Sequence, residues 1–355
     1  MTAEFWSGRR VFITGHTGFK GAWLALWLNK LRAKVVGYSL PAPTMPSLFE
    51  AAQVAQTLRS LEGDVRDLER LRAGLREAAP EVVFHLAAQA LVRTSYEDPV
   101  GTFSANLLGT VHLLEACRAA PALRAVIIVT SDKCYEESSA EKPRCEGDSL
   151  GGHDPYAASK ACAEIATAAY RRSYFMPDAT RIAVASARAG NVIGGGDWAA
   201  DRLLPDLVRA FNTGRRARIR NPGATRPWQH VLDPLSGYMM LAERLSNDGQ
   251  DFAEAWNFGP PPGGSVTVGE IADRAARIWG PGAAWEPEST PQPREASALV
   301  LDPGKANRRL AWKPWLGFDA ALDWTVPWYK SWYQGSDARA LAESQIERFM
   351  EVQSS

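Results

Sequence analysis

Short apolar runs alternate with longer stretches of helical length along the first half of the chain. Each run is rich in Val, Ile, Phe or Ala and is short enough for a buried strand; the runs cover residues 11–14, 34–38, 82–89, 125–129 and 182–187. Strands that alternate with helices form parallel sheets. The pattern therefore predicts an α/β fold with a doubly wound parallel sheet, from about residue 10 to residue 188.

The pattern changes beyond residue 190. Clusters of glycine and proline interrupt shorter elements at 194–196, 221–223, 259–264 and 286–293, which is typical of a loop-rich unit. We expect a sheet domain over residues 1–190 and a smaller second domain over residues 191–355, with a segment near 229–260 as a candidate to return to the first. A ligand cleft should lie between the second domain and the carboxyl ends of the strands.

Three glycines follow the first predicted strand, each three residues after the last, and an apolar helix pattern follows them. This is the context of a dinucleotide site, because glycine permits a tight turn and a close approach of the backbone to phosphate, and the helix N-terminus attracts its charge. The sequence therefore predicts a Rossmann domain. The cofactor contacts expected at this turn are Gly15, His16, Thr17, Gly18, Phe19 and Gly21.

The choice of dinucleotide depends on the end of the second predicted strand, where Tyr38 and Ser39 stand. Folds that select NAD usually carry an acid there, and an arginine accommodates the extra phosphate of NADP; neither follows this strand directly. We expect NAD, with a ribose contact from Ser39. Asp64 fits two interpretations, an acceptor for the adenine amino group or the N-cap of a helix starting near Arg66. Further expected cofactor contacts are Tyr38, Val65, Leu86, Ala87, Ala88, Gln89, Tyr156 and Lys160.

Side chains suited to acid–base chemistry follow the strand predicted before residue 130. Ser131, Asp132 and Lys133 come first, and Tyr156 and Lys160 follow after a short loop. Four residues apart, Tyr156 and Lys160 share one helix face, where the lysine charge lowers the pKa of the phenol and makes it a base for alcohol oxidation. Asp132 and Lys133 add a second acid/base pair. Their other interpretation is a solvated pair in a strand-end turn.

Composition narrows the class of protein. The chain has 355 residues, 46% of them apolar, and its 40 basic side chains balance 40 acidic ones. This balance disfavours bulk attraction to nucleic acid or membranes, no run approaches the roughly 18 apolar residues of a membrane span, and the first residues show no secretory pattern. We expect a cytoplasmic enzyme without nucleic-acid or membrane partners. The cysteines lack CxxC spacing and predict reduced thiols and no metal site: Cys117, Cys134, Cys145 and Cys162.

The glycine turn, Ser131 and Tyr156-x-x-x-Lys160 together resemble the extended short-chain dehydrogenase/reductase superfamily. Within it, the dTDP-glucose and GDP-mannose dehydratases carry Asp-Glu after the hydroxyl residue, and sugar epimerases carry small or hydroxyl residues there. Ser-Asp-Lys-Cys-Tyr at 131–135, together with segments 15–21, 38–50 and 226–230, resembles the CDP-D-glucose 4,6-dehydratases instead. The resemblance spans most of the chain.

This resemblance implies that CDP-D-glucose is converted to CDP-4-keto-6-deoxy-D-glucose, in deoxy-sugar biosynthesis, with NAD regenerated in each turnover. It implies that Tyr156 takes the proton of the C4 hydroxyl, supported by Lys160, and that Ser131 donates to the developing carbonyl oxygen. Lys133 would remove the C5 proton, and Asp132 would protonate the departing C6 hydroxyl.

The resemblance also implies where the nucleotide sugar binds. Asn191 and Arg226 match positions that hold the diphosphate, and Arg93 and Glu136 are candidates for the glucose end. Segments that line the nucleoside and the pocket wall contribute Arg202, Leu203, Arg220 and His230. Members of the superfamily pair through two helices, which begin here near residues 98 and 156, so we expect a homodimer or a dimer of dimers.

Two other functions stay open. A nucleotide-sugar C4 epimerase shares Tyr156 and Lys160 but needs no acid/base pair at Asp132 and Lys133. A non-catalytic dinucleotide-sensing module would keep the glycine turn and has no need of the catalytic side chains.

Overall fold

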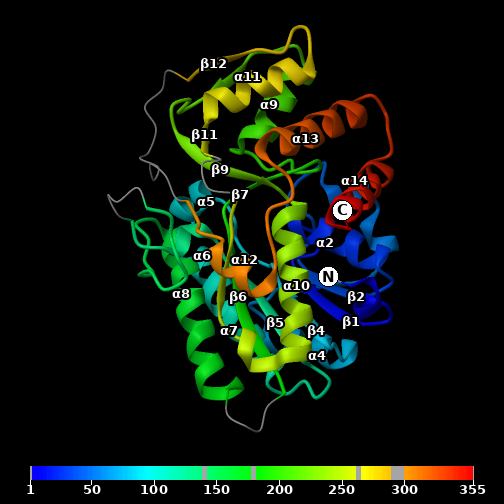
Figure 1. The fold of residues 1–355 in the computed structure, drawn as a ribbon, viewed down its shortest axis with the longest axis vertical. Helices are drawn as coiled ribbons and strands as arrows, with labels where there is room; N and C mark the ends of the chain where they lie inside the picture. Colours follow the sequence, from blue (N-terminus) through cyan, green and yellow to red (C-terminus); the bar gives the residue numbers. More distant parts are fainter. Residues whose placement is uncertain (1, 138–141, 177–180, 261–264, 289–299, 355) are drawn as a thin grey trace.

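The computed structural model describes residues 2–137, 142–176, 181–260, 265–288 and 300–354. The centre of this part of the chain is a parallel sheet of seven strands in the order β10-β6-β5-β4-β1-β2-β3 (Figure 1). The strands are β1 (Arg10–Thr14), β2 (Lys34–Ser39), β3 (Arg59–Glu62), β4 (Val82–His85), β5 (Ala125–Val129), β6 (Ala183–Ala189) and β10 (Ala255–Phe258). The predicted doubly wound sheet is confirmed.

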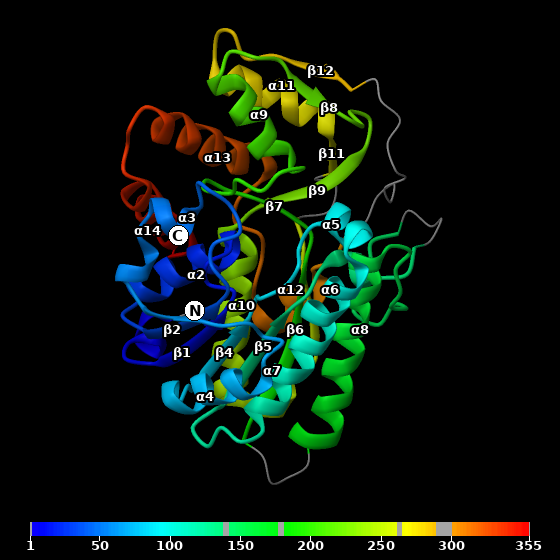
Figure 2. The same ribbon diagram turned by 180° about the vertical axis from the view of Figure 1, so that it is seen from behind.

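Helices cover both faces of the sheet, which explains why its strands are apolar on both sides. Successive residues of β5 point to opposite faces: Ile127 packs into the cluster built with α2 and α10, and Ile128 into the cluster built with α4 and α7. Figure 2 shows the second layer from behind. The covering helices are α2 (Phe19–Lys30), α10 (Leu232–Asp248), α4 (Leu68–Ala78), α7 (Gly109–Cys117) and α8 (Pro155–Tyr170).

The strand order reverses at β1, which pairs with β2 on one side and with β4 on the other. The connections that leave β1 and β4 run in opposite directions, and this opens a crevice at the carboxyl edge of the sheet. Because α2 begins at Phe19, the glycine turn of residues 15–18 lies at that crevice.

A smaller lobe stands over this edge of the sheet, at the top of Figure 1. It has a core of its own, in which Phe211, Trp228 and Ile271 are buried together. A capping box fixes the start of α11, since Thr267 and Glu270 each accept the backbone N–H of the other. The lobe contains β7 (Asn191–Ile193), β8 (Ala217–Ile219), β9 (Thr225–His230), β11 (Ser265–Thr267), β12 (Trp285–Pro287), α9 (Leu203–Asn212), α11 (Val268–Trp279) and α13 (Phe318–Tyr333).

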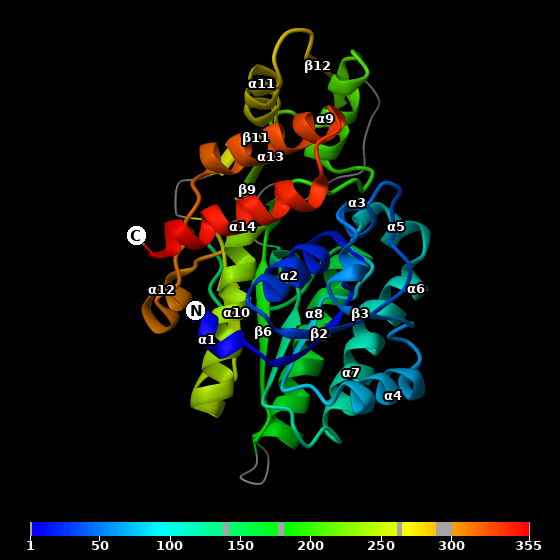
Figure 3. The same ribbon diagram turned by 90° about the vertical axis from the view of Figure 1, so that its right-hand side faces the viewer.

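The chain passes between the lobe and the sheet more than once. α10 and β10 return to the sheet, where β10 pairs with β6, and α12 (Gly304–Leu310) packs beside β10. The last helix, α14 (Ala338–Ser354), lies across α2 (Figure 3). The domain division at residue 190 stays a prediction, and parts of the clusters at 259–264 and 286–293 lie outside the described residues. Within the described ranges, no helix is long and apolar enough to cross a membrane.

The helix expected from Asp98 begins as predicted. Asp98 Oδ1 accepts the N–H of Gly101 at 2.8 Å and Pro99 takes the first helical position. The helix continues as α6 (Pro99–Phe103), a π-helical stretch (Ser104–Leu108) and α7, which ends at Cys117. The short helices elsewhere are α1 (Ala3–Trp6), α3 (Leu48–Ala51) and α5 (Val92–Glu97).

The interpretation of Asp64 as a helix N-cap is wrong. The helix after β3 begins later, and its N-cap is Asp67, whose Oδ1 accepts the N–H of Arg70 at 3.0 Å. Residues 64–67 form a turn first, in which the Asp64 carboxylate accepts the N–H of Arg66 at 2.9 Å and pairs with its guanidinium. Asp67, three residues after Asp64, is therefore the N-cap of this helix.

Candidate active site

A cavity of about 850 Å³ lies between the carboxyl edge of the large sheet and the smaller lobe. Ligand sites of α/β sheets commonly have this size and lie at this position. The residues of the predicted site that line the cavity are Gly15, Thr17, Gly18, Phe19, Gly21, Leu86, Ala88, Gln89, Arg93, Ser131, Asp132, Lys133, Tyr156, Lys160, Asn191, Arg202, Leu203, Arg220 and Arg226. The structure therefore brings the glycine turn, the acid–base groups and the arginines of the lobe to one space.

The glycine turn has the shape that a dinucleotide diphosphate requires. Gly15 has a φ of +78°, and a Cβ added there would lie 2.6 Å from the backbone nitrogen of Ala87. Gly18 is the N-cap of α2 and supplies no side chain to accept the first N–H groups of the helix. These N–H groups and the positive end of the helix dipole stay available to phosphate. The residues present therefore fit a dinucleotide.

Asp132 is held at the end of β5 by its neighbour. Ser131 Oγ donates to Asp132 Oδ1 at 2.9 Å and accepts the backbone N–H of Lys133 at 3.2 Å. Asp132 is only 5% exposed, which is incompatible with a solvated turn. Burial raises the pKa of Asp132, although Lys133, Ser131 and Lys20 oppose the shift. A carboxyl group with a raised pKa retains a proton that it can donate.

Tyr156 and Lys160 lie in the first turns of α8, which Asp154 caps. Burial raises the pKa of Tyr156 to about 12, and its hydrogen bond with Ser131 opposes the shift. The expected lowering of this pKa by Lys160 does not appear in this geometry. The Lys160 ammonium donates to the carbonyl oxygen of Val129 at 3.4 Å, and burial lowers its own pKa to about 8.

Lys20 is a cavity residue that the sequence analysis did not single out. Burial lowers its pKa to about 7; the charges of Arg202 and Lys160 act in the same direction, and Asp132 opposes them. At such a pKa both forms of the amine are populated near neutral pH, as an acid or a base requires. Its signal was in the sequence, because Lys20 is the charged residue in an otherwise apolar stretch after Gly18.

Asp201 is a second residue that was missed. Its Oδ1 lies 3.3 Å from Arg93 Nη1 and 3.1 Å from Arg220 Nη1. Arg93 is a candidate for the glucose end and Arg220 was expected at the nucleoside, yet one carboxylate holds both. Asp201 has a φ of +61°, a conformation that sequence spacing does not reveal.

Several predicted cofactor contacts lie outside the cavity lining: His16, Tyr38, Ser39, Asp64, Val65 and Ala87. Each polar side chain among them has a partner in the sheet domain. His16 is fully buried with Nε2 2.7 Å from Ser60 Oγ, and Tyr38 donates its hydroxyl to the carbonyl oxygen of Asp64 at 3.0 Å. Ser39 Oγ lies 2.8 Å from Thr17 Oγ1, so it can position that lining residue.

Two predicted substrate contacts also lie outside the lining. His230 is fully buried between the rings of Trp23 and Trp324, since β9 turns this side chain into the aromatic core. Glu136 lies 2.7 Å from His153 Nε2 on the surface. His85, at the end of β4, is likewise a buried core histidine, with Nδ1 2.7 Å from Thr14 Oγ1.

The comparisons with known proteins agree with this geometry. Residues 11–259 match the model of the NAD dependent epimerase/dehydratase family. The chain belongs to this family. A CDP-glucose 4,6-dehydratase from Salmonella typhimurium is 48% identical over 350 residues, which are 98% of each protein. NAD is therefore the cofactor, as the absence of an arginine directly after Ser39 predicted.

Solved structures of the same fold include NAD complexes. The UDP-glucose 4-epimerase of Thermus thermophilus, in complex with NAD, is 26% identical with a TM-score of 0.78 and matches 92% of this chain and 99% of its own. The UDP-glucose 4-epimerase of Thermotoga maritima, solved with UDP-glucose, has a TM-score of 0.76 at 21% identity over 90% of this chain and 98% of its own, and this likeness supports the fold.

Proposed function

We propose that the chain catalyses the 4,6-dehydration of CDP-D-glucose to CDP-4-keto-6-deoxy-D-glucose. C4 is oxidised, water leaves from C5 and C6, and the resulting double bond takes a hydride at C6 and a proton at C5, so the sugar loses water with no net change of oxidation state. One observation carries the proposal: a buried Asp132 and a partly buried Lys133 share a cavity with Tyr156 and Lys160. The 48% identity to a CDP-glucose 4,6-dehydratase supports the same substrate.

NAD supplies the hydride acceptor for C4 and the hydride donor for C6. The residues of this chain move the protons. Tyr156 accepts the proton of the C4 hydroxyl. The Ser131 hydroxyl turns from Asp132 Oδ1, to which it donates in the absence of substrate, and donates to the carbonyl oxygen that develops at C4. The hydrogen bond between these two hydroxyl groups opposes the burial that raises the Tyr156 pKa, and so favours the form that accepts a proton. Lys160 keeps the strand end in place through Val129.

Elimination needs an acid and a base on the same sugar. The C4 ketone acidifies the C5 proton, which Lys133 removes, and Asp132 protonates the C6 hydroxyl so that it leaves as water. The raised pKa of Asp132 supports its role as the acid. Lys20 is the second candidate for the C5 base, because it lines the same cavity with a pKa near 7 and Glu136 does not line it.

The lobe binds the nucleotide. Arg226 and Asn191 hold the diphosphate, and guanidinium groups suit its oxygens. Arg202, Leu203 and Arg220 line the same cavity and are the contacts that we propose for the cytidine. The choice of cytosine rests on the Salmonella relative and on the match at residues 38–50 and 226–230.

The second candidate function is C4 epimerisation, which the fold of the UDP-glucose 4-epimerases favours. It gives the buried Asp132 and its neighbour Lys133 no role in the reaction. A sensor function likewise leaves Tyr156 and Lys160 without one. Incubation with CDP-glucose and trace NAD separates the three: formation of a 4-keto-6-deoxy sugar supports dehydration, CDP-galactose indicates an epimerase, and an unchanged substrate rejects both.

We also propose a homodimer that pairs through α6, α7 and α8. Large apolar side chains are exposed on these helices and beside them: Tyr96, Val100, Leu108 and Ile165. Val100 is 78% exposed and Ile165 57%, and a partner subunit would cover them. A hydrodynamic mass near 38.8 kDa, that of one chain, would reject the dimer.

A further inference from the structure

A second cavity of about 570 Å³ lies away from the active site, and no described residue lines both. Its walls come from the carboxyl-terminal half of α8, from β6 and β10, from α12 and from the segment around residue 146. The volume falls within the range of ordinary small-molecule sites. None of the proposed steps of the dehydration uses this space.

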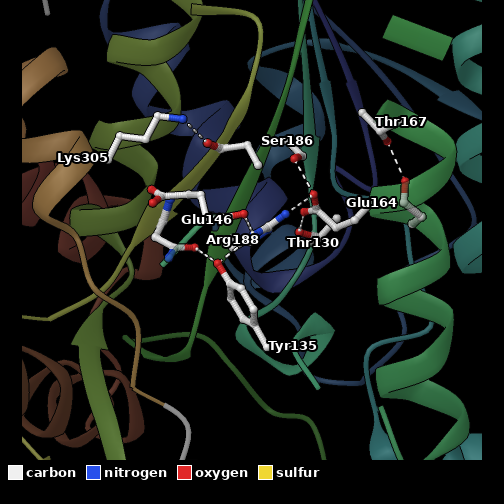
Figure 4. A network of polar contacts seen from close by, with 11 residues as sticks. Thr130, Tyr135, Glu146, Glu164, Thr167, Ser186, Arg188 and Lys305 are labelled. Carbon is white, nitrogen blue, oxygen red and sulfur yellow. Dashed lines mark hydrogen bonds and ion pairs between the residues drawn. The ribbon is translucent and has the colours of Figure 1, made fainter. Parts of the chain in front are cut away.

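Its floor is a fixed network of polar side chains, shown in Figure 4. Arg188 and Glu164 form a buried ion pair at 2.8 Å, and both side chains are 3% exposed. Arg188 also donates to Tyr135 Oη at 2.7 Å, and Glu164 accepts from Thr130 at 2.5 Å and from Ser186 at 2.6 Å. The guanidinium of Arg188 is therefore held in one orientation.

The acids around the cavity already have partners. Glu164 pairs with Arg188, and Glu254 pairs with Lys305 at 2.5 Å. Glu146 accepts the backbone N–H of Asn257 at 2.9 Å. Asp302, the fourth acid in the lining, accepts the backbone N–H of Gly304 at 2.8 Å. Glu164 and Glu254 are thus paired with cations, and Glu146 and Asp302 accept hydrogen bonds from neutral groups.

Among the described residues that line the cavity, the positively charged side chains outnumber the carboxylates. Among the described residues, Arg171, Arg172 and Arg308 line the cavity and form no ion pair. The Nη1 of Arg171 and the Nε of Arg188 are buried and have no hydrogen-bond partner in that part of the chain. Burial lowers the pKa of Arg171; the charges of Arg172 and Arg188 add to this effect, and those of Glu164 and Glu254 oppose it. Buried donors without acceptors cost free energy that a bound anion would recover.

We propose that this cavity binds a small phosphate monoester, with the phosphate held by Arg171, Arg172 and Arg308 above the floor formed by Arg188. Guanidinium groups match the oxygens of a phosphate dianion in pairs, which favours this ligand over a single carboxylate. The remaining volume takes the organic part of the molecule.

The test is calorimetric titration of the full-length enzyme with glycerol 3-phosphate, with inorganic phosphate and with succinate, at constant ionic strength. Saturating CDP is present throughout, so that the proposed diphosphate site in the active-site cavity is filled. We expect binding of glycerol 3-phosphate and inorganic phosphate that weakens at least tenfold in the double variant R172Q/R308Q. Both residues are exposed, so the variant should fold. The matched control is R277Q, an exposed arginine of α11, which should bind like the wild type.

A second readout uses the melting temperature, because a ligand that binds only the folded protein raises it. Glycerol 3-phosphate should raise the melting temperature of the wild type and of R277Q, and leave that of R172Q/R308Q unchanged. Absence of binding to the CDP-saturated wild type, or equal binding by wild type and double variant, would overturn the proposal. Equal affinity for succinate would overturn the assignment to phosphate. These outcomes do not depend on turnover of CDP-glucose.

Discussion

Ser131 Oγ donates a hydrogen bond of 2.9 Å to Asp132 Oδ1, between adjacent residues at the carboxyl end of β5. The same Ser131 interacts with Tyr156, so one hydroxyl joins the oxidation base to the elimination acid. Burial raises the pKa of Asp132, although the hydrogen bond from Ser131 acts in the opposite direction. The proton needed for water loss therefore stays on Asp132 up to a higher pH than it would on an exposed aspartate.

We expect the rate of water elimination to fall as pH rises through the raised pKa of Asp132, because only the protonated carboxyl can donate. Asp132→Asn should remove this limb of the pH profile and slow elimination by about 10²- to 10⁴-fold, while oxidation at C4 survives in part. The measurement is the single-turnover rate of 4-keto-6-deoxy sugar formation against pH. If the elimination rate of D132N falls with rising pH as that of the wild type does, a group other than Asp132 causes the fall.

Gly15→Ala tests the glycine turn. The new Cβ would lie 2.6 Å from Ala87 N, at a φ that alanine rarely adopts, so the turn must shift. We expect at least a tenfold loss of NAD affinity, or a protein that does not fold. Gly317→Ala is the matched control, since nothing lies within 4 Å of its added Cβ and its φ is −64°. NAD titration and thermal melting are measured for both variants. Unchanged NAD affinity in Gly15→Ala would contradict the assignment of this turn to the NAD site.

Glu164→Gln tests the buried pair. It leaves Arg188 as an unpaired buried charge, and such losses typically cost about 3–5 kcal/mol of unfolding free energy. Asp248→Asn, at an exposed pair with Arg244, should cost less than about 1 kcal/mol. Chemical denaturation of both variants measures the difference, and equal small losses would show that the Glu164 pair is not stabilising.

The same pair has a pH signature. Burial opposes ionisation of Glu164, but Arg188, Ser186 and Thr130 outweigh it and hold the Glu164 pKa below its usual 4.5. A lowered pKa in the folded state adds stability above pH 4.5, and this stability is lost as pH falls through the folded value. The stability difference between wild type and Glu164→Gln should therefore shrink below pH 4.5. A difference that stays constant down to acid unfolding contradicts this.

Ile165→Glu tests the proposed dimer. Ile165 is 57% exposed on α8, so a monomer tolerates the charge, whereas an apolar interface does not. We expect monomers by sedimentation with an unchanged melting curve at low concentration. Glu69→Gln, an exposed acid on α4, is the control and should leave the mass unchanged. A dimer that survives Ile165→Glu places the interface elsewhere.

The sequence predicted the sheet because its signals are local. A buried strand such as Ala125–Val129 is apolar without interruption, and Gly15 marks a turn that tolerates no other residue. The acid–base groups were predicted for the same reason, since strand ends and helix faces follow from spacing. Lys20 had a signal that was overlooked, a charge in an apolar helix.

Other parts of the site depend on contacts between distant segments. His230 looks like a pocket residue by its motif, yet Trp23 and Trp324, far away in the chain, enclose it. Asp201 forms ion pairs with both Arg93 and Arg220, which are more than a hundred residues apart in the sequence. No local sequence pattern predicts this contact. The pKa of Tyr156 likewise follows from burial and not from its spacing to Lys160.

The central claim is that oxidation and elimination use different residues of one cavity, with Lys133 as the C5 base. The most direct measurement is solvent deuterium at C5 after a single turnover in heavy water, with reduced-nicotinamide absorbance followed in parallel. Wild type should place deuterium at C5. Lys133→Ala should still produce the absorbance with little deuterium at C5, and Tyr156→Phe should produce neither. Lys133→Ala that turns over within about threefold of wild type, below the smallest effect of losing a base, would contradict the claim, and loss of C5 deuterium in Lys20→Ala would then make Lys20 the base.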